Sequence, residues 1–359
     1  YRLHDPDNLA SVPGARVWTG LHGNLQITEA TSMAYDNVND LIVTGHQDTG
    51  AARQSAPGSA TWTSLHLADG GIVQVGNVDT NADGTNDVGV QYGSSQVFSG
   101  FGAHTDTGLA LDQRDLGVNG TGTPKNRLNG PAATRFQDTV QFINPYVVNA
   151  IDPTKFLVGT GNVRAGTGHH YLTVPDGAAP DDPLDDLALQ NGAPVAAGST
   201  FAPNAGANVG RITALAYGGR ERDIGGNLVD QTEIAYAATF GTAAGSGKLF
   251  VRLAAGASFV EITSWNTSAN PADPHGSGIR DIVLNPENWR RFYVIDSDSR
   301  VWRGELANDG STNTTWTQLT GNLSDLIKVG GRRTELAAID LFFDGGATTG
   351  GGDDTEVLL

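Results

Sequence analysis

A short segment of this chain occurs twice, once near each end. Residues 18–25 (WTGLHGNL) return as residues 316–323 (WTQLTGNL), and a shorter echo, WTSL, stands at 62–65. The alternating stretches rich in Thr and Trp predict strands, and Gly-Asn follows each of the two long copies. A strand unit that recurs at a spacing of tens of residues is typical of a solenoid, a propeller or another array. The two ends of the chain are therefore expected to be equivalent parts of one repeating fold.

The residue content predicts an all-β protein. The chain has 359 residues, of which 48 are glycine, together with many Thr, Ser, Asn and Asp residues that favour turns. Apolar residues do not recur at the helical spacing of i, i+3, i+4 and i+7 over any long stretch. No apolar run reaches the roughly 18 residues that a membrane-spanning helix needs, so we expect no membrane insertion.

The charge and the absence of cysteine exclude several classes of function. The net charge of −17 argues against binding to nucleic acid or to anionic membranes. Without cysteine the chain forms no disulfide and carries out no thiol chemistry. This composition is typical of many secreted bacterial proteins. Because residue 1 is Tyr rather than Met, we expect a processed protein or an excised domain.

The strand pattern divides into blades of four antiparallel strands. We expect the first strands of successive blades at 30–36, 71–79, 145–152, 211–217, 279–284 and 336–343. The last blade has only two predicted strands at the C-terminus, and residues 1–3 and 16–21 match the missing two. The sequence therefore predicts one closed β-propeller over 1–359, with six blades and one blade shared between the N- and C-termini. The alternative is seven blades, because residues 98–210 are difficult to divide into strands and blades.

Two long insertions interrupt this pattern. Residues 105–135 are polar and rich in Gly and Asn, and residues 175–208 are rich in Ala, Pro, Gly and Asp. Neither has the periodicity of a core element, so we expect both to be loops on one face of the propeller. Long loops of this kind serve either partner contact or surface decoration.

Residues 79–87 (DTNADGTND) form the sharpest local motif. Oxygen-bearing residues at alternate positions, with Gly at the sixth, allow a short loop to wrap a hard cation such as Ca²⁺. The predicted structural calcium ligands are Asp79, Asn81, Asp83, Thr85 and Asp87. Val90 stands where an EF-hand has its bidentate Glu, so water or an outside group would complete the shell. The loop resembles those of integrin-like propeller blades; the alternative is a plain turn between two strands.

A series of motifs in the first hundred residues resembles a known superfamily. Residues 45–50 (GHQDTG), 55–62 (SAPGSATW), 69–71 (DGG) and 92–96 (YGSSQ) follow one another in order. This order is similar to the Asp-box (BNR-type) β-propellers, which include sortilin-like receptors and xyloglucanase-like glycoside hydrolases. The resemblance implies a propeller fold, in which the Asp-box is a turn that holds strands together. Pro57 and Ser59 replace the Asp and Gly of that box.

No set of residues in the sequence forms a recognisable catalytic or cofactor-binding site. Glycoside hydrolysis requires two carboxylates that face each other across a cleft. Carboxylates near predicted strand ends are plentiful, but the sequence pairs no two of them: Asp36, Asp48, Asp69, Asp152, Glu261, Asp281 and Asp296. Five tryptophans are expected to pack between blades rather than to stack on sugars: Trp62, Trp265, Trp289, Trp302 and Trp316.

These patterns together predict a non-catalytic, extracellular binding or assembly module, secreted or at the cell surface and stabilised by calcium. Its partner would be a protein or a glycan, or a second copy of the chain. The alternative is a secreted carbohydrate-active enzyme that uses a carboxylate pair at the mouth of the channel. A sortilin-like receptor domain is a third reading, which the absence of a Cys-rich region disfavours.

Overall fold

The computed structural model describes residues 2–3, 18–19, 29–78, 85–86, 88–96, 102–105, 142–143, 145–153, 155–159, 163–167, 212–240, 247–254, 257, 259–265, 278–320, 328–329, 332–333, 341–344 and 355–358. These residues form antiparallel β-sheets and one short 3-10 helix, Thr263–Trp265. Within the described part, no helix is long and apolar enough to span a membrane.

Five sheets form the described body of the molecule, and we number them 1 to 5 in chain order. Sheets 1, 4 and 5 each have four strands that pair in the order of the chain. Sheet 1 consists of β3 (Ala30–Asp36), β4 (Leu41–His46), β5 (Gly50–Gln54) and β6 (Trp62–His66). Sheet 4 consists of β13 (Ile212–Arg222), β14 (Leu228–Thr239), β15 (Leu249–Arg252) and β16 (Val260–Glu261). Sheet 5 consists of β17 (Ile279–Asn285), β18 (Asn288–Asp296), β19 (Val301–Leu306) and β20 (Thr314–Gln318).

Sheets 2 and 3 have three described strands each, and three further strand pairs form separate two-stranded sheets. Sheet 2 consists of β7 (Gly70–Val78), β8 (Val88–Ser95) and β9 (Gly102–Thr105). Sheet 3 consists of β10 (Tyr146–Val148), β11 (Lys155–Gly159) and β12 (Val163–Thr167). The separate pairs are β1 (Arg2–Leu3) with β2 (Trp18–Thr19), β21 (Lys328–Val329) with β22 (Arg332–Arg333), and β23 (Leu341–Asp344) with β24 (Thr355–Leu358).

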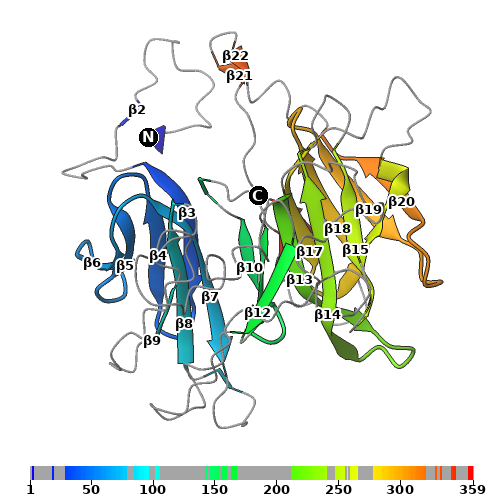
Figure 1. Ribbon diagram of the computed structural model, residues 1–359, viewed down its shortest axis with the longest axis horizontal. Helices are drawn as coiled ribbons and strands as arrows, with labels where there is room; N and C mark the ends of the chain where they lie inside the picture. Colours follow the sequence, from blue (N-terminus) through cyan, green and yellow to red (C-terminus); the bar gives the residue numbers. More distant parts are fainter. Residues whose placement is uncertain are drawn as a thin grey trace, which may run out of the picture.

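The first strands of consecutive sheets lie side by side. β3 lies beside β7, β7 beside β10, β10 beside β13, and β13 beside β17 (Figure 1). β17 in turn contacts β23. Four-stranded antiparallel sheets that meet through their first strands give a propeller-like arrangement. The predicted all-β class is confirmed. The described strands do not join β1–β2 and β23–β24 into one sheet, so the predicted shared blade and the blade count stay predictions.

Both long insertions lie outside the described residues, apart from Thr105 at the end of β9. One predicted strand, 145–152, is shorter in the structure. β10 ends at Val148 because the Oδ1 atom of Asn149 accepts hydrogen bonds from the backbone N–H groups of Ile151 and Asp152. A side chain that bonds its own following backbone replaces the strand with a turn.

Small irregularities in the first strands connect neighbouring sheets. The register of β3 shifts around Thr31, and that of β13 shifts around Thr213 at the corresponding position. The hydroxyl of Thr31 donates to the carbonyl oxygens of Gly70 and Gly71 in sheet 2, and the hydroxyl of Thr213 donates to that of Ile279 in sheet 5. A β-bulge re-aims a side chain, and here it turns a threonine toward the next sheet.

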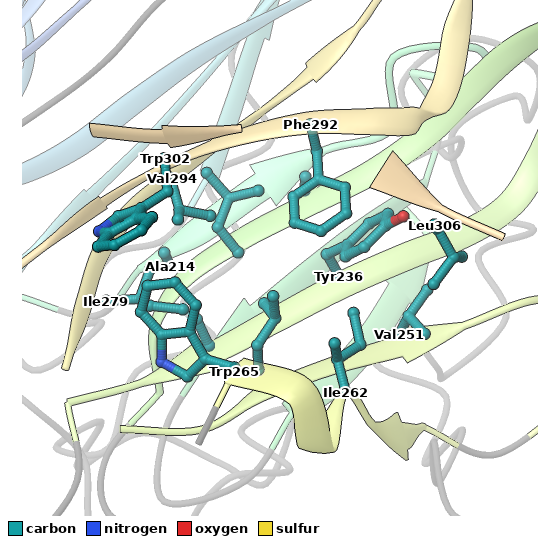
Figure 2. Packing of buried hydrophobic residues seen from close by; sticks show 14 of the residues in the cluster. Ala214, Tyr236, Val251, Ile262, Trp265, Ile279, Phe292, Val294, Trp302 and Leu306 are labelled. Carbon is teal, nitrogen blue, oxygen red and sulfur yellow. The ribbon is translucent and has the colours of Figure 1, made fainter. Parts of the chain in front are cut away.

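The largest hydrophobic cluster lies between sheets 4 and 5. Tyr236 of β14 packs on Phe292 of β18, with ring centroids 4.7 Å apart, and Trp265 meets the edge of Trp302 at 6.2 Å (Figure 2). The Trp316 ring lies 4.9 Å from that of Trp265. These indoles contact protein on their faces, so the structure uses them for packing between sheets.

We expect the two positions Trp265 and Trp62 to respond differently to truncation. Trp265→Ala should lower the free energy of unfolding by about 3–5 kcal/mol, because it opens a cavity in a fully buried cluster. Trp62→Ala should change it by less than about 1 kcal/mol, since that side chain is 40% exposed. Urea denaturation followed by fluorescence measures both values. Equal losses would contradict the packing role assigned to Trp265.

Candidate functional site

A cavity of about 630 Å³ lies between the first strands of sheets 2 to 5. Its wall is formed by β7, β10, β13 and β17, which run next to one another in the middle of the molecule (Figure 1). The turns that follow these strands form its rim and include Asn86, Asn149, Ala150 and Pro286. The cavity is therefore axial, and it opens at the end of the molecule where first strands turn into second strands.

The described wall of this cavity is apolar and amide-rich. Gln74 and Asn77 of β7 contribute amides, and the Oδ1 atom of Asn77 is buried without a hydrogen-bond partner. Arg220 is the single charged side chain among the described lining residues, and its Nε donates to Asp230 at 2.8 Å. No described lining residue is a carboxylate. The described wall thus holds no acid pair of the kind that glycoside hydrolysis requires.

Buried Asp and Asn side chains recur where first strands end. Asp36 of sheet 1, Asn149 of sheet 3 and Asn285 of sheet 5 each accept hydrogen bonds from the backbone N–H groups two and three residues ahead. All three are buried. Asp36 was singled out from the sequence as a carboxylate near a strand end, but Asn149 and Asn285 were not, although an Asp or Asn between an apolar run and a turn is a visible signal.

In sheet 4 the first strand, β13, does not end at the corresponding position. A bulge at Gly218 interrupts its pairing with β14, and the hairpin of β13 and β14 continues beyond it. Gly218 has a φ of 74°, and a Cβ atom on it would collide with Oδ1 of Asn149. The register shifts there, between Tyr217 and Gly219. The amide nitrogen of Asn149 donates to the carbonyl of Thr232 at 2.7 Å, so sheet 3 holds the bulge. The close approach requires glycine at position 218.

Beyond this bulge β13 and β14 extend as a hairpin over the edge of sheet 5. Arg222 forms a two-point ion pair with Glu287, with N–O distances of 2.6 and 3.1 Å. Glu221 accepts from Nε1 of Trp289 and from Nε of Arg290, at 3.1 and 3.2 Å. The hairpin is therefore braced at its base, and it carries Ile224 fully exposed at its tip.

A charge cluster lies behind the cavity, between sheets 3 and 4. Glu233 accepts from Nζ of Lys155 at 3.0 Å and from Arg252 at 2.8 Å. Burial alone would raise the pKa of Glu233, but the hydrogen bonds from the two cations outweigh it and hold that pKa below its ordinary value. Burial raises the pKa of the cavity residue Tyr217, and the nearby Glu233 charge adds to the effect. Glu233 is thus ionised and links Lys155 to Arg252, rather than serving as a proton donor.

Six of the seven carboxylates singled out in the sequence accept hydrogen bonds or form ion pairs, whereas Asp48 is held through its backbone N–H, which donates to Asp69. Asp36 accepts from Gln91, and Asp296 accepts from Arg300 and from Nε1 of Trp302. The remaining engaged carboxylates are Asp69 with Gln47, Asp152 with Lys155, Glu261 with Lys248, and Asp281 with the N–H of Ile282. None of these forms a facing pair across the cavity wall that the structure describes.

Of the predicted calcium ligands, the structure describes only Thr85, which is exposed. Asp79, Asn81, Asp83 and Asp87 lie outside the described residues. The motif connects β7 to β8, whose register pairs Val78 with Val88, and Asn86 within it borders the axial cavity. Among the residues that the structure describes, no three His, Asp or Glu side chains gather into a metal site.

The segment that resembles an Asp-box forms the turn between β5 and β6. The backbone N–H and the hydroxyl of Ser55 both donate to the carbonyl of Thr61, each at 3.0 Å. The hydroxyl of Ser59 accepts the N–H of Thr61. The turn thus closes through the hydroxyls of Ser55 and Ser59, while Pro57 stands at the position of the family's aspartate.

Comparison with known proteins finds a likeness to solved structures but none at the level of sequence families. No family model and no curated protein matches this chain. Among solved structures, a GH74 enzyme from Niastella koreensis is similar with a TM-score of 0.42 and 13% identity, over 80% of this chain. The chain spans 38% of the length of that structure. A likeness of this degree carries no conclusion about activity, so the function is argued from the geometry.

Two glycines with positive φ provide a test of the rim. Gly226→Ala should lower the free energy of unfolding by about 1–2 kcal/mol, because alanine is strained at a φ of 83° but meets no atom there. Gly218→Ala should lower it by more, since Asn149 cannot move without losing its turn bonds. Urea denaturation compares the two variants. Equal losses would contradict the tight contact between sheets 3 and 4.

Proposed function

We propose that this chain is a non-catalytic, extracellular binding or assembly module that displays the axial cavity and its rim to a protein or glycan partner. The observation that carries the proposal is the chemistry of the cavity wall. Apart from Tyr217 and Arg220, its described side chains are amides and apolar groups, and the carboxylates of Asp36, Asp152 and Asp296 are engaged in structural bonds. Such a wall suits recognition, whereas hydrolysis of a glycosidic bond needs two free carboxyl groups.

The module would be a closed propeller of six blades and a divergent member of the Asp-box superfamily. Sheets 1 to 5 supply five blades, and the terminal pairs β23–β24 and β1–β2 would share the sixth. The repeated WT-x-L segment supports this division, because Trp18 of β2 corresponds to Trp316, which lies in the fourth strand of sheet 5. The β5–β6 turn supports the superfamily assignment, because the Asp-box-like segment 55–62 forms it and a bond from Ser55 to Thr61 closes it.

A calcium ion in the β7–β8 loop would make that part of the rim rigid. Asp79, Asn81, Asp83, Thr85 and Asp87 have the spacing of a cation-binding loop, and Asn86 borders the cavity. The β13–β14 hairpin, which is held against sheet 5, also extends beyond the cavity. A partner would then meet the cavity together with this rigid hairpin.

The alternative is a secreted carbohydrate-active enzyme. It would require two carboxylates about 5–9.5 Å apart at the mouth of the channel. The abundance of acidic residues favours it only weakly, because most of the carboxylates described near the strand ends already have partners. A screen for reducing sugars released from neutral polysaccharides separates the two functions. Hydrolysis by the purified protein would overturn the non-catalytic assignment.

Calorimetric unfolding in excess calcium and in chelator tests the proposed metal. Calcium should raise the melting temperature of the wild-type protein, because a ligand that binds only the folded state stabilises it. Asp83→Ala should abolish this rise by removing a ligand. Glu29→Ala, a change at an exposed acidic residue outside the loop, should retain it. An identical melting temperature with and without calcium in the wild type would refute the calcium site.

A further inference from the structure

The β13–β14 hairpin projects from sheet 4 and has a well-ordered tip. Residues 222–230 are all exposed, and Figure 1 shows the hairpin extending beyond the rest of sheet 4. The tip is closed by hydrogen bonds: the N–H of Asp223 donates to the carbonyl of Asn227, and the N–H of Asn227 donates to the Asp223 carboxylate. With the ion pairs at its base, these bonds give the hairpin a fixed shape before any partner binds.

One edge of the hairpin has no strand beside it in the part of the chain that the structure describes. β15 pairs with β14 only over 235–238, so residues 228–231 of β14 pair with β13 alone. The carbonyls of Thr232 and Glu233, between these two stretches, accept from side chains of other strands and turns. The open edge is therefore confined to 228–231, where the hairpin projects.

The register of the hairpin shows which backbone groups point to this open edge. Hydrogen-bonded and non-hydrogen-bonded pairs alternate along an antiparallel ladder. Asp223 and Asn227 are bonded through their backbone, so the next bonded pair along the ladder includes Val229. The residues on either side of Val229, Leu228 and Asp230, therefore direct their N–H and C=O groups away from β13.

The open edge lacks the features that usually prevent strand edges from pairing. Residues 219–231 contain neither lysine nor proline, and the bulge at Gly218 comes before them. Leu228 is 43% exposed and Val229 is 38% exposed. An edge with exposed apolar side chains and outward backbone groups is a template for another strand. A glycan lacks the two-residue repeat of such an edge, so a polypeptide fits it better.

The charges of the hairpin indicate which polypeptide. Its arginines and the neighbouring Arg290 are each paired with a carboxylate: Arg220 with Asp230, Arg222 with Glu287, and Arg290 with Glu221. Asp223 is the one other charged residue of 219–231. The whole chain has a net charge of −17, so two copies repel each other over most of their surface. A nearly neutral edge is the place where two such copies can approach.

We propose that the open edge of β14 pairs antiparallel with the same edge of a second copy of this chain, forming a two-fold dimer. The proposal rests on the assembly role given under the proposed function and names its partner and its surface. Bonding through both outward residues places Leu228 opposite the second copy's Asp230, and Val229 opposite the second copy's Val229. A register centred on Asp230 would set two carboxylates opposite each other, which is destabilising.

The concentration dependence of the mass tests whether the dimer exists. Pairing of so few residues lies at the small end of protein interfaces, so we expect a dissociation constant on the order of 10–100 µM. Light scattering and sedimentation velocity from about 1 to 300 µM should show the mass rising from that of a monomer toward that of a dimer. A monomer at every concentration would overturn the proposal.

Matched lysine substitutions test the surface. Val229→Lys should raise the dissociation constant about tenfold or more, because two ammonium groups would face each other at the two-fold axis. Val260→Lys is the control, since Val260 is also an exposed valine of sheet 4 but lies on β16. It should dimerise like the wild type, and both variants should keep the wild-type melting temperature. Dimerisation that survives Val229→Lys, or is lost in Val260→Lys, would place the interface elsewhere.

Single cysteines test the register in a chain that has no other thiol. In the proposed dimer the two copies of Val229→Cys have Cα atoms about 4.5 Å apart, within the range that a disulfide bridges. The two copies of Leu228→Cys are diagonal, at about 7–8 Å, which is too far. Mild oxidation should therefore give covalent dimers of the first variant and leave the second reduced, as measured on non-reducing gels. Equal crosslinking of the two would contradict the register.

These outcomes are separate from those that decide the proposed function. A wild-type monomer, or a dimer formed through another surface, would overturn the pairing of β14 and leave the calcium and polysaccharide measurements unchanged. Hydrolysis of a polysaccharide would overturn the non-catalytic assignment, whether or not the chain dimerises.

Discussion

Burial of both faces of each sheet is the constraint on which the described structure depends. A sheet that is apolar on both faces needs a neighbour on each side, and antiparallel sheets more often leave one face to water. Between sheets 4 and 5 the cluster around Trp265 and Phe292 satisfies this need with interlocking rings. The threonine hydroxyls at the bulges of β3 and β13 add polar contacts between first strands. A row of such sheets leaves one face of its first sheet and one face of its last sheet without a neighbour. Both faces are covered when the row closes into a ring.

The same constraint shapes the rim of the axial cavity. Because first strands lie side by side at the centre, their ends converge, and the buried amides of Asn149 and Asn285 hold the turns there. Sheet 4 departs from this pattern at Gly218, where the bulge admits Asn149 and lets the hairpin extend. The rim is therefore made of short locked turns and one braced projection. A rigid and uneven surface of this kind fits the binding role that we propose.

Several features of the fold could be predicted from sequence because they follow from short-range patterns. The strand pairs around 30–46 and 279–296 were visible as alternating segments separated by turn residues. The end of β10 at Val148 was missed, since the side-chain bond of Asn149 to its own backbone does not disturb the apolar pattern. The candidate site was predicted less well. The sequence pointed to carboxylates and a calcium loop, but not to the amides that line the cavity.

The sequence by itself determined the all-β class, because strand period and turn residues are local properties, and the WT-x-L repeat predicted that the two chain ends are equivalent. Only the tertiary structure decided which acidic residues are free to act. Asp36 meets Gln91 and Glu233 meets Lys155, each on a neighbouring sheet and more than 50 residues away, and those contacts exist only once the sheets have packed. The exposed Met33 and Tyr35 belong to the same category, since exposure depends on which sheet comes to lie against them.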